Sequence, residues 1–386
     1  MSRRERDVLK VMSLVLEGER TQEEAARLLG LSTRQVRRIL VRVRSKGDVG
    51  VVHRLRGKPS NHRLKSSVRK KAMAIYRKEL VGFQPKHAWE KLVEMGLDMS
   101  ARTLHAWLVA EGLWKRVRKV EQHRTRRVRK PCVGEMVQAD ASEHDWLEGR
   151  GPRMVLVGMI DDATGRIFVR FYESETTEAY MDLLMRYIQK FGRPLIWYSD
   201  RDSIFRAEEK RPGYDEKQSV PTQFSRALAQ LEIQMILANS PQAKGRIERL
   251  WGTLQMRWAS EFRRAKITTM EQANALIETK LLADHNRRFA IAPASPNDAH
   301  RTKKDFDLPA IFSHQATRCI RNDYTIQYDN HLYQLLPPVL PGQRGNKAIL
   351  EQRLDGTTHI RFKNKYLQFT KIKTIPATPS NSEGNT

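Results

Sequence analysis

The chain has 386 residues, a formal net charge of +26 and an isoelectric point near 10.2. At roughly 100–200 residues per domain, two to four domains are expected. The excess of Lys and Arg indicates a polyanionic partner. Nucleic acid is the favoured partner, and an anionic membrane surface is the alternative. The sequence contains no run of about 18 apolar residues and no secretory signal, so we expect no membrane association and a cytoplasmic protein. Its two cysteines are too few for a disulfide framework or a four-cysteine zinc site.

Residues 1–46 are expected to form a helix-turn-helix DNA-binding domain. Two short helices each begin with a hydroxyl cap followed three residues later by Glu or Gln, at Thr21 with Glu24 and at Ser32 with Gln35. Gly30 separates the two helices. The alternative is an ordinary helical hairpin with a solvated basic face. As a DNA-binding element, the second helix would present groove-reading and phosphate-contacting side chains, namely Thr33, Arg34, Gln35, Arg37 and Arg38.

Residues 66–114 are expected to form a second helical, helix-turn-helix-like module. Its tryptophans, Trp89 and Trp107, fit a core better than a DNA-reading surface. Residues 115–131 follow as a basic linker, in which positions 115–130 carry nine Lys or Arg and one acid. Such a run is usually solvated, but between DNA-binding modules it favours contact with phosphates.

Residues 132–290 alternate between strand and helix patterns, which predicts a central α/β domain with a mixed sheet. Continuous apolar runs at 154–160 and 167–172 predict buried strands. Charge, two prolines and a glycine at 206–221 indicate a surface insertion.

Residues 310–375 change to strand patterns joined by turn residues, including Asp355-Gly356, and predict a small β-barrel or sandwich. We take the barrel as the expected form. Residues 376–386 have the composition of a disordered tail.

Three carboxylates stand at positions suited to catalysis. Asp140 follows the apolar run of the first expected strand, Asp200 closes a later strand, and Glu248 lies one turn inside a helix. Taken singly, each acid is more often a surface or capping residue. If the strand ends and the helix converged, the three charges would repel each other, and divalent cations would remove that conflict. Two such cations can stabilise the attacking and leaving oxygens of a phosphoryl displacement.

Four segments carry a specific resemblance: QADASEHDWLEGRGPR (138–153), GMIDDATGRI (158–167), YSDRDSIFR (198–206) and NSPQAKGRIERLWGTLQ (239–255). They resemble insertion-sequence transposases of the ISNCY group, within the integrase catalytic core superfamily, and the resemblance covers nearly the whole chain. It implies a ribonuclease-H-like core in which Asp140, Asp200 and Glu248 bind two Mg²⁺ or Mn²⁺ ions. Asp200 and Glu248 are 48 positions apart, longer than the family's usual spacing, and the 206–221 insertion accounts for the difference.

Residues beside these acids carry competing interpretations. Lys244, Arg246 and Arg249 could merely confer solubility, but beside such a site we expect phosphate contacts. Asp161 and Asp162 precede a Thr-Gly turn and are expected to cap it, outside the metal cluster.

The resemblance implies a polynucleotidyl transferase that cleaves and joins DNA strands, in the bacterial cytoplasm and associated with the nucleoid. Its partners would be double-stranded DNA, as terminal inverted repeats and as target, and further copies of the chain in a homodimer or higher multimer. Two alternatives stay open: a transposase-derived regulator without catalysis, and a metal-dependent nuclease that cuts without joining.

Overall fold

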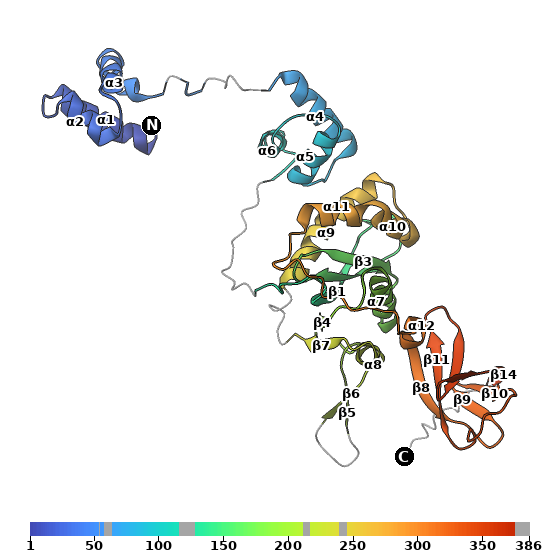
Figure 1. Ribbon diagram of the computed structural model, residues 1–386. Coiled ribbons are helices and arrows are strands. Elements are labelled where there is room, and N and C mark those ends of the chain that lie inside the picture. Colours follow the sequence, from blue (N-terminus) through green and yellow to red (C-terminus); the bar gives the residue numbers. More distant parts are fainter. Residues whose placement is uncertain (54, 58–63, 116–127, 211–216, 239–244, 375–386) are drawn as a thin grey trace, which may run out of the picture. The chain divides into compact units, whose positions relative to one another are not determined.

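The computed structural model describes residues 1–53, 55–57, 64–115, 128–210, 217–238 and 245–374 (Figure 1). The chain divides into two compact units, Met1–Met73 and Ala74–Thr386. None of the described helices is both long and apolar enough to cross a membrane.

The first unit contains the expected helix-turn-helix. Its helices are α1 (Arg3–Leu16), α2 (Gln22–Leu29) and α3 (Thr33–Lys46), followed by the 3₁₀ turn η1 (Gly47–Val51). Thr21 and Glu24 form the expected reciprocal capping box, whereas Ser32 accepts only from the Gln35 backbone N–H, at 3.3 Å. Buried apolar side chains from all three helices form one small core, with Met12 and Val36 fully buried.

Helix α4 (Ser66–Glu79) crosses the boundary between the units, and α5 (Pro85–Glu94) and α6 (Ala101–Ala110) follow in the second. Tyr76, Leu92, Leu104 and Leu108 are buried. The second helical module therefore has the expected three helices. The proposed domain limits stay predictions.

The central sheet has strand order β3-β2-β1-β4-β7. Strands β1 (Met136–His144), β2 (Met154–Asp161) and β3 (Ile167–Tyr172) are antiparallel neighbours, and β4 (Ile196–Ser199) and β7 (Gln234–Leu237) continue the sheet in parallel with β1. The expected α/β domain with a mixed sheet is therefore present. In the 206–221 region, β5 (Ala207–Lys210) pairs antiparallel with β6 (Lys217–Val220), between two elements of the core.

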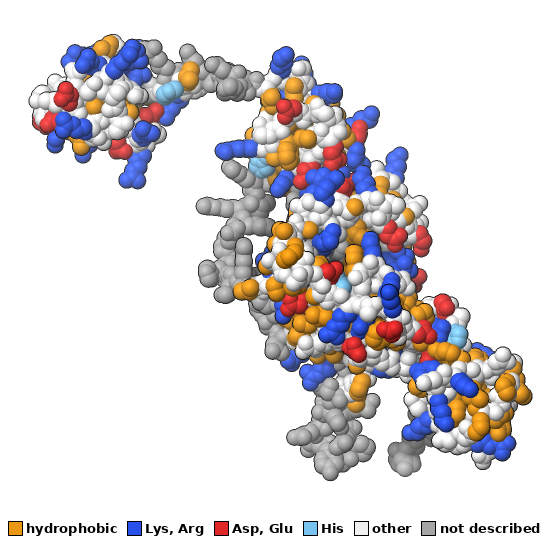
Figure 2. Space-filling model, in the orientation of Figure 1, with side chains coloured by type: hydrophobic (Ala, Val, Ile, Leu, Met, Phe, Trp, Pro, Cys, Tyr) orange, Lys and Arg blue, Asp and Glu red, His pale blue; other side chains and the backbone are white. Residues whose placement is uncertain are grey.

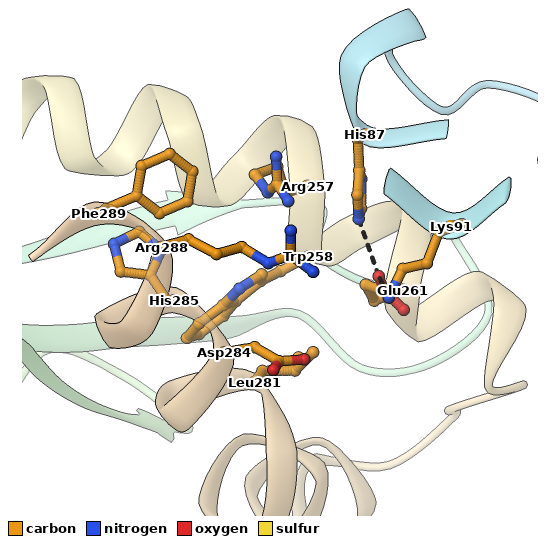
Figure 3. Close-up of a pocket in the computed structure, with 10 residues that line it drawn as sticks. All are labelled: His87, Lys91, Arg257, Trp258, Glu261, Leu281, Asp284, His285, Arg288 and Phe289. Carbon is orange, nitrogen blue, oxygen red and sulfur yellow. Dashed lines mark hydrogen bonds and ion pairs between the residues drawn. The ribbon is translucent and has the colours of Figure 1, made fainter. Parts of the chain in front are cut away.

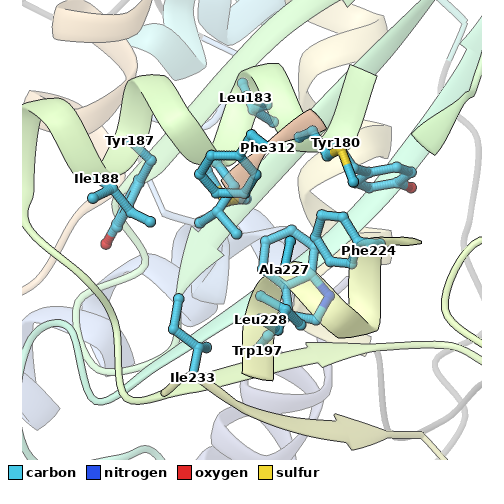
Figure 4. Close-up of a cluster of buried hydrophobic side chains, with 14 of the residues drawn as sticks. Tyr180, Leu183, Tyr187, Ile188, Trp197, Phe224, Ala227, Leu228, Ile233 and Phe312 are labelled. Carbon is cyan, nitrogen blue, oxygen red and sulfur yellow. The ribbon is translucent and has the colours of Figure 1, made fainter. Parts of the chain in front are cut away.

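Helices cover both faces of the sheet and complete two cores. On one face, α7 (Thr177–Phe191) and α8 (Gln223–Gln230) bury Tyr180, Trp197 and Phe224, with Phe312 reaching the same cluster from the C-terminal region (Figure 4). On the other face, α9 (Gly245–Arg264) and α10 (Met270–Leu276) pack Trp251, Leu254 and Phe262 against the sheet. Alternate residues of β2 belong to opposite cores, since strand side chains point alternately to either face.

Two asparagines bind the outer edge of β3. The Asn274 side chain of α10 exchanges hydrogen bonds with the backbone of Phe171 at 2.8 and 3.1 Å. Asn286 of α11 (Leu282–Phe289) does the same with Ile167 at 2.8 and 3.0 Å. Twelve residues of regular α-helix would leave the two amides about 120° apart around the axis. The π-helical turn η3 (Ile277–Leu281) between them absorbs extra residues, which lets both amides face β3.

The C-terminal region corrects the barrel expectation. Among its described strands, β14-β10-β9 form one sheet and β13-β12-β11-β8 another, so there is no single closed sheet. The bounds are β8 (Ser313–Cys319), β9 (Thr325–Tyr328), β10 (His331–Leu335), β11 (Lys347–Arg353), β12 (Thr358–Phe362), β13 (Lys365–Leu367) and β14 (Phe369–Thr374), preceded by α12 (Leu308–Ile311). The local turns were predicted, but the pairing of β14 with β10, which are distant in the sequence, was not. The expected tail at 376–386 lies outside the described residues.

Candidate active site

Asp140 and Asp200 occupy matching positions on neighbouring parallel strands. Gln138 of β1 is aligned with Tyr198 of β4, and each aspartate lies two residues farther along its strand. Because paired strands run about 4.8 Å apart, the matching positions are adjacent. Asp140 is still within β1, whereas Asp200 is the first residue after β4, and both are half-buried.

Helix α9 reaches this edge through Trp251. Its indole Nε1 donates to Asp140 Oδ2 at 2.9 Å. The ring lies against Gly158, the cross-strand partner of Asp140 on β2, where a Cβ would meet Trp251 Cη2 at 2.7 Å. Glu248 lies three residues before Trp251, and residues three apart lie on neighbouring parts of a helix surface. The tryptophan contact therefore brings the first turn of α9 towards Asp140.

Glu248 is exposed in the first turn of α9, directly after the undescribed segment 239–244. Within the part of the chain that the structure describes, no three His, Cys, Asp or Glu side chains are grouped closely enough to hold a metal ion. The strand alignment places Asp140 and Asp200 at adjacent positions. The role of Glu248 in the triad stays a prediction.

Glu175 is an acid near this site that the sequence analysis missed. It accepts a hydrogen bond from the Tyr180 hydroxyl at 2.6 Å. Burial raises the pKa of Glu175, the Tyr180 bond lowers it, and the charges of Asp202, Asp140 and Asp200 raise it again. Strand β3 ends at Tyr172 and runs parallel to β1, so its carboxyl end lies at the same edge as that of β4. The position of Glu175, three residues after the end of β3, is the signal from which the sequence analysis could have predicted it.

Asp161 caps the β2–β3 turn as expected. Its Oδ1 accepts from the Thr164 backbone N–H at 2.8 Å and from the Thr164 hydroxyl at 2.6 Å. Asp162 differs from its neighbour, because its carboxylate is fully buried and pairs with Arg246 of α9. Arg246 was expected to contact phosphate; here its guanidinium lies against Asp162, and the phosphate contact stays a prediction.

The expected DNA-contacting residues lie mostly at the surface. Arg34, Gln35, Arg37 and Arg38 are exposed on α3, and Thr33 is half-buried. Figure 2 shows Lys and Arg side chains on the surface of this first unit. Arg249 is exposed on α9, and Lys244 lies outside the described residues.

A second charged cluster joins α5 to α9 and α11 (Figure 3). Glu261 Oε1 lies 2.8 Å from both His87 Nε2 and Lys91 Nζ, and all three side chains are buried. Burial opposes ionisation of Glu261, but the bonds from His87 and Lys91 outweigh it and lower its pKa to about 2. Burial lowers the pKa of His87. The adjoining cavity measures about 20 Å³, room for one water, so we assign this cluster to attachment of the helical module.

Parts of the sequence are similar to known proteins. Residues 8–70 match the winged helix-turn helix family. The chain is 42% identical over 303 residues to "Putative transposase y4bF" of Sinorhizobium fredii (strain NBRC 101917 / NGR234), which covers 78% of this chain and 65% of that protein. The chain thus spans slightly less than two thirds of that relative. It is also 26% identical over 407 residues to the "Transposase for insertion sequence IS1202" of Streptococcus pneumoniae, covering 92% of this chain and 83% of that one.

Solved structures with local similarity include two integrases. The HTLV-2 integrase catalytic core domain in complex with magnesium is 15% identical, with 37% of this chain and 82% of that chain covered and a TM-score of 0.29. A simian T-cell lymphotropic virus intasome is 15% identical, with 75% and 97% covered and a TM-score of 0.34. By sequence, the chain is similar to transposases, one of them from an insertion sequence.

Proposed function

We propose that the chain is a DNA transposase that binds the terminal inverted repeats of an insertion sequence and catalyses metal-dependent strand cleavage and strand transfer. The observation that carries this proposal is the pair Asp140 and Asp200, aligned on adjacent parallel strands in a chain homologous to transposases. In this proposal Glu248 is the third carboxylate. It lies on α9, the helix whose Trp251 donates a hydrogen bond to Asp140.

The donor set fits a hard divalent cation. Aspartate and glutamate oxygens are the ligands that Mg²⁺ and Mn²⁺ prefer. Asp140 and Asp200 lie near enough to Glu175 for their charges to act on it, and a cation would balance the negative charge of these acids. Asp140, Asp200 and Glu248 would hold two ions, which would stabilise the attacking and leaving oxygens when bound.

The chemistry has two steps. Hydrolysis of a phosphodiester at the element's end leaves a 3′ hydroxyl. That hydroxyl then attacks a target phosphodiester and joins the strands. The Trp251 N–H donates to Asp140 Oδ2 and so helps to fix the direction of that carboxylate. Arg249 and Lys244 would contact phosphates beside the reacting bond.

Recognition of the element's ends is assigned to α3. Arg34, Gln35, Arg37 and Arg38 are exposed on it, and a recognition helix of this kind reads base edges in the major groove. Since both ends must be held together, the active form would be a homodimer or a higher multimer.

The test is a cleavage and strand-transfer assay on the DNA ends that flank the gene. Activity should require Mg²⁺ or Mn²⁺, and Asp140→Asn, Asp200→Asn and Glu248→Gln should each abolish it while leaving end binding intact. Robust cleavage in EDTA would refute the metal mechanism. Binding without any cleavage by the wild type would favour the regulator, and cleavage without joining would favour the nuclease.

Binding specificity is tested separately in gel shifts with the full chain. Arg34→Ala should reduce the preference for end DNA over random DNA. Log affinity should fall linearly with log salt, by about 0.9 for each phosphate neutralised. An unchanged preference in Arg34→Ala would place recognition outside α3.

A further inference from the structure

Asp162 is a buried carboxylate that the proposed chemistry does not use. It follows the last residue of β2, and its side chain is fully buried. Burying a carboxylate is strongly unfavourable unless hydrogen bonds and an opposite charge compensate. Its partners therefore define what the residue holds together.

Those partners come from three separate segments. Asp162 Oδ2 accepts from the Lys130 backbone N–H at 2.8 Å, and Oδ1 accepts from Gln138 Nε2 at 2.7 Å. The Arg246 guanidinium pairs with Oδ1. Gln138 is itself 1% exposed, so this is a buried and well-enclosed network. Asp161, in contrast, bonds to Thr164 within its own turn, so the turn does not require Asp162.

The partner residues lie directly before the proposed catalytic acids. Gln138 precedes Asp140 by two positions on β1, on the same side of the strand. Arg246 precedes Glu248 by two positions in the first turn of α9. Glu248 thus lies between two attachments of α9, Arg246 to Asp162 and Trp251 to Asp140.

We propose that Asp162 is a positioning residue for the transposase reaction: through Arg246 it fixes the first turn of α9, and with it Glu248, relative to Asp140. This inference rests on the proposed function, and it gives Arg246 a structural role in place of phosphate contact. Helix termini fray unless their first turn is held, and Arg246 and Glu248 both lie in the first turn of α9. A misplacement of about 1 Å in a catalytic group can reduce a rate roughly 100-fold.

The test compares Asp162→Asn, Arg246→Gln and Arg246→Lys in the full chain. One readout is kcat and KM for cleavage of end DNA with Mg²⁺; the other is hydrogen exchange of the amides at 245–249. The Asn and Gln variants should lose roughly 10-fold to 100-fold in kcat with little change in KM, and should exchange faster at 245–249. Arg246→Lys should retain most activity, since an ammonium can still pair with Asp162. The double variant with both Asp162→Asn and Arg246→Gln should have a kcat no lower than that of either single variant, because the two residues act as a unit.

Asp182→Asn is the matched control. Asp182 accepts from Tyr172 at 2.8 Å and from Arg186 at 2.7 Å in the same domain, so the variant breaks a comparable acid–arginine pair on α7. It should leave kcat and exchange at 245–249 unchanged. An unchanged kcat in Asp162→Asn and Arg246→Gln would overturn the inference, as would a raised KM with unchanged kcat, which would indicate phosphate contact by Arg246. If the wild type does not cleave DNA, the proposed function fails. The attachment of α9 through Asp162 and Arg246 is then still tested, because unchanged hydrogen exchange at 245–249 in Asp162→Asn and Arg246→Gln would overturn it.

Discussion

Gly158→Ala should disturb the packing of α9 on β2, next to Asp140 of β1. Gly158 is buried opposite Asp140, and a Cβ there would lie 2.7 Å from Trp251 Cη2 and 2.7 Å from Val169 Cγ1. Carbon atoms pack best at about 3.5–4.0 Å, so these neighbours would have to retreat by roughly 0.8–1.3 Å. Trp251 cannot move that far without shifting α9 or weakening its bond to Asp140.

Two measurements follow from that displacement. Overpacking of a filled core costs about 1–3 kcal/mol, which lowers Tm by about 2–4 °C for each kcal/mol in a domain of this size. Because Glu248 moves with the helix, cleavage of end DNA should fall by up to roughly 100-fold. Thermal unfolding followed by tryptophan fluorescence and a cleavage assay with Mg²⁺ measure the two effects.

Gly252→Ala is the matched control. It makes the same substitution on α9, one residue after Trp251, where an added Cβ meets nothing within 4 Å. Replacing a glycine inside a helix with alanine should stabilise the chain by about 0.5–1 kcal/mol. The two variants should therefore change Tm in opposite directions. If Gly158→Ala retained full Tm and full activity, the close packing of Trp251 on β2 would not position the site.

Two further predictions concern stability. Replacing Asn274 or Asn286 with alanine should lower the free energy of unfolding by about 1–3 kcal/mol each, because polar backbone groups of β3 lose their hydrogen-bond partners. A thermal unfolding scan measures this loss as a lower Tm. Light scattering should show association of chains through the freed edge of β3. An unchanged Tm in both variants would refute the edge role. Glu261 has its pKa lowered to about 2, so its contribution should be fully present above about pH 4.5 and should fade as the pH falls towards 2. The Tm difference between wild type and Glu261→Gln should therefore shrink between pH 6 and 3, and a constant difference would contradict the buried pairing.

Local features of the fold were predictable because their determinants lie within a few residues. The capping box at Thr21 and the apolar runs of β2 and β3 each depend on short-range pattern. The matching positions of Asp140 and Asp200 follow from two apolar runs that the sequence marks clearly, although β1 continues beyond Asp140 to His144. The closed C-terminal sheet was a wrong prediction, because turn residues identify hairpins but not which distant strands pair.

Contacts between distant segments were beyond the sequence analysis. Asp162 and Arg246 are 84 positions apart, and His87 and Glu261 are 174 apart. A single sequence gives no reason to pair those charges rather than others, so Asp162 was interpreted as a turn residue. Its complete burial is a property of tertiary packing, and that burial is what makes its partners informative.

The most direct test of the central claim is a crystal structure of the full chain bound to end DNA and Mn²⁺, with anomalous scattering used to locate the metal. The account predicts Mn²⁺ peaks between the carboxylates of Asp140 and Asp200, with Glu248 turned towards them, and no such peaks in Asp200→Asn. Mn²⁺ bound elsewhere on the chain, with Asp140 and Asp200 free of metal in the presence of DNA, would contradict it.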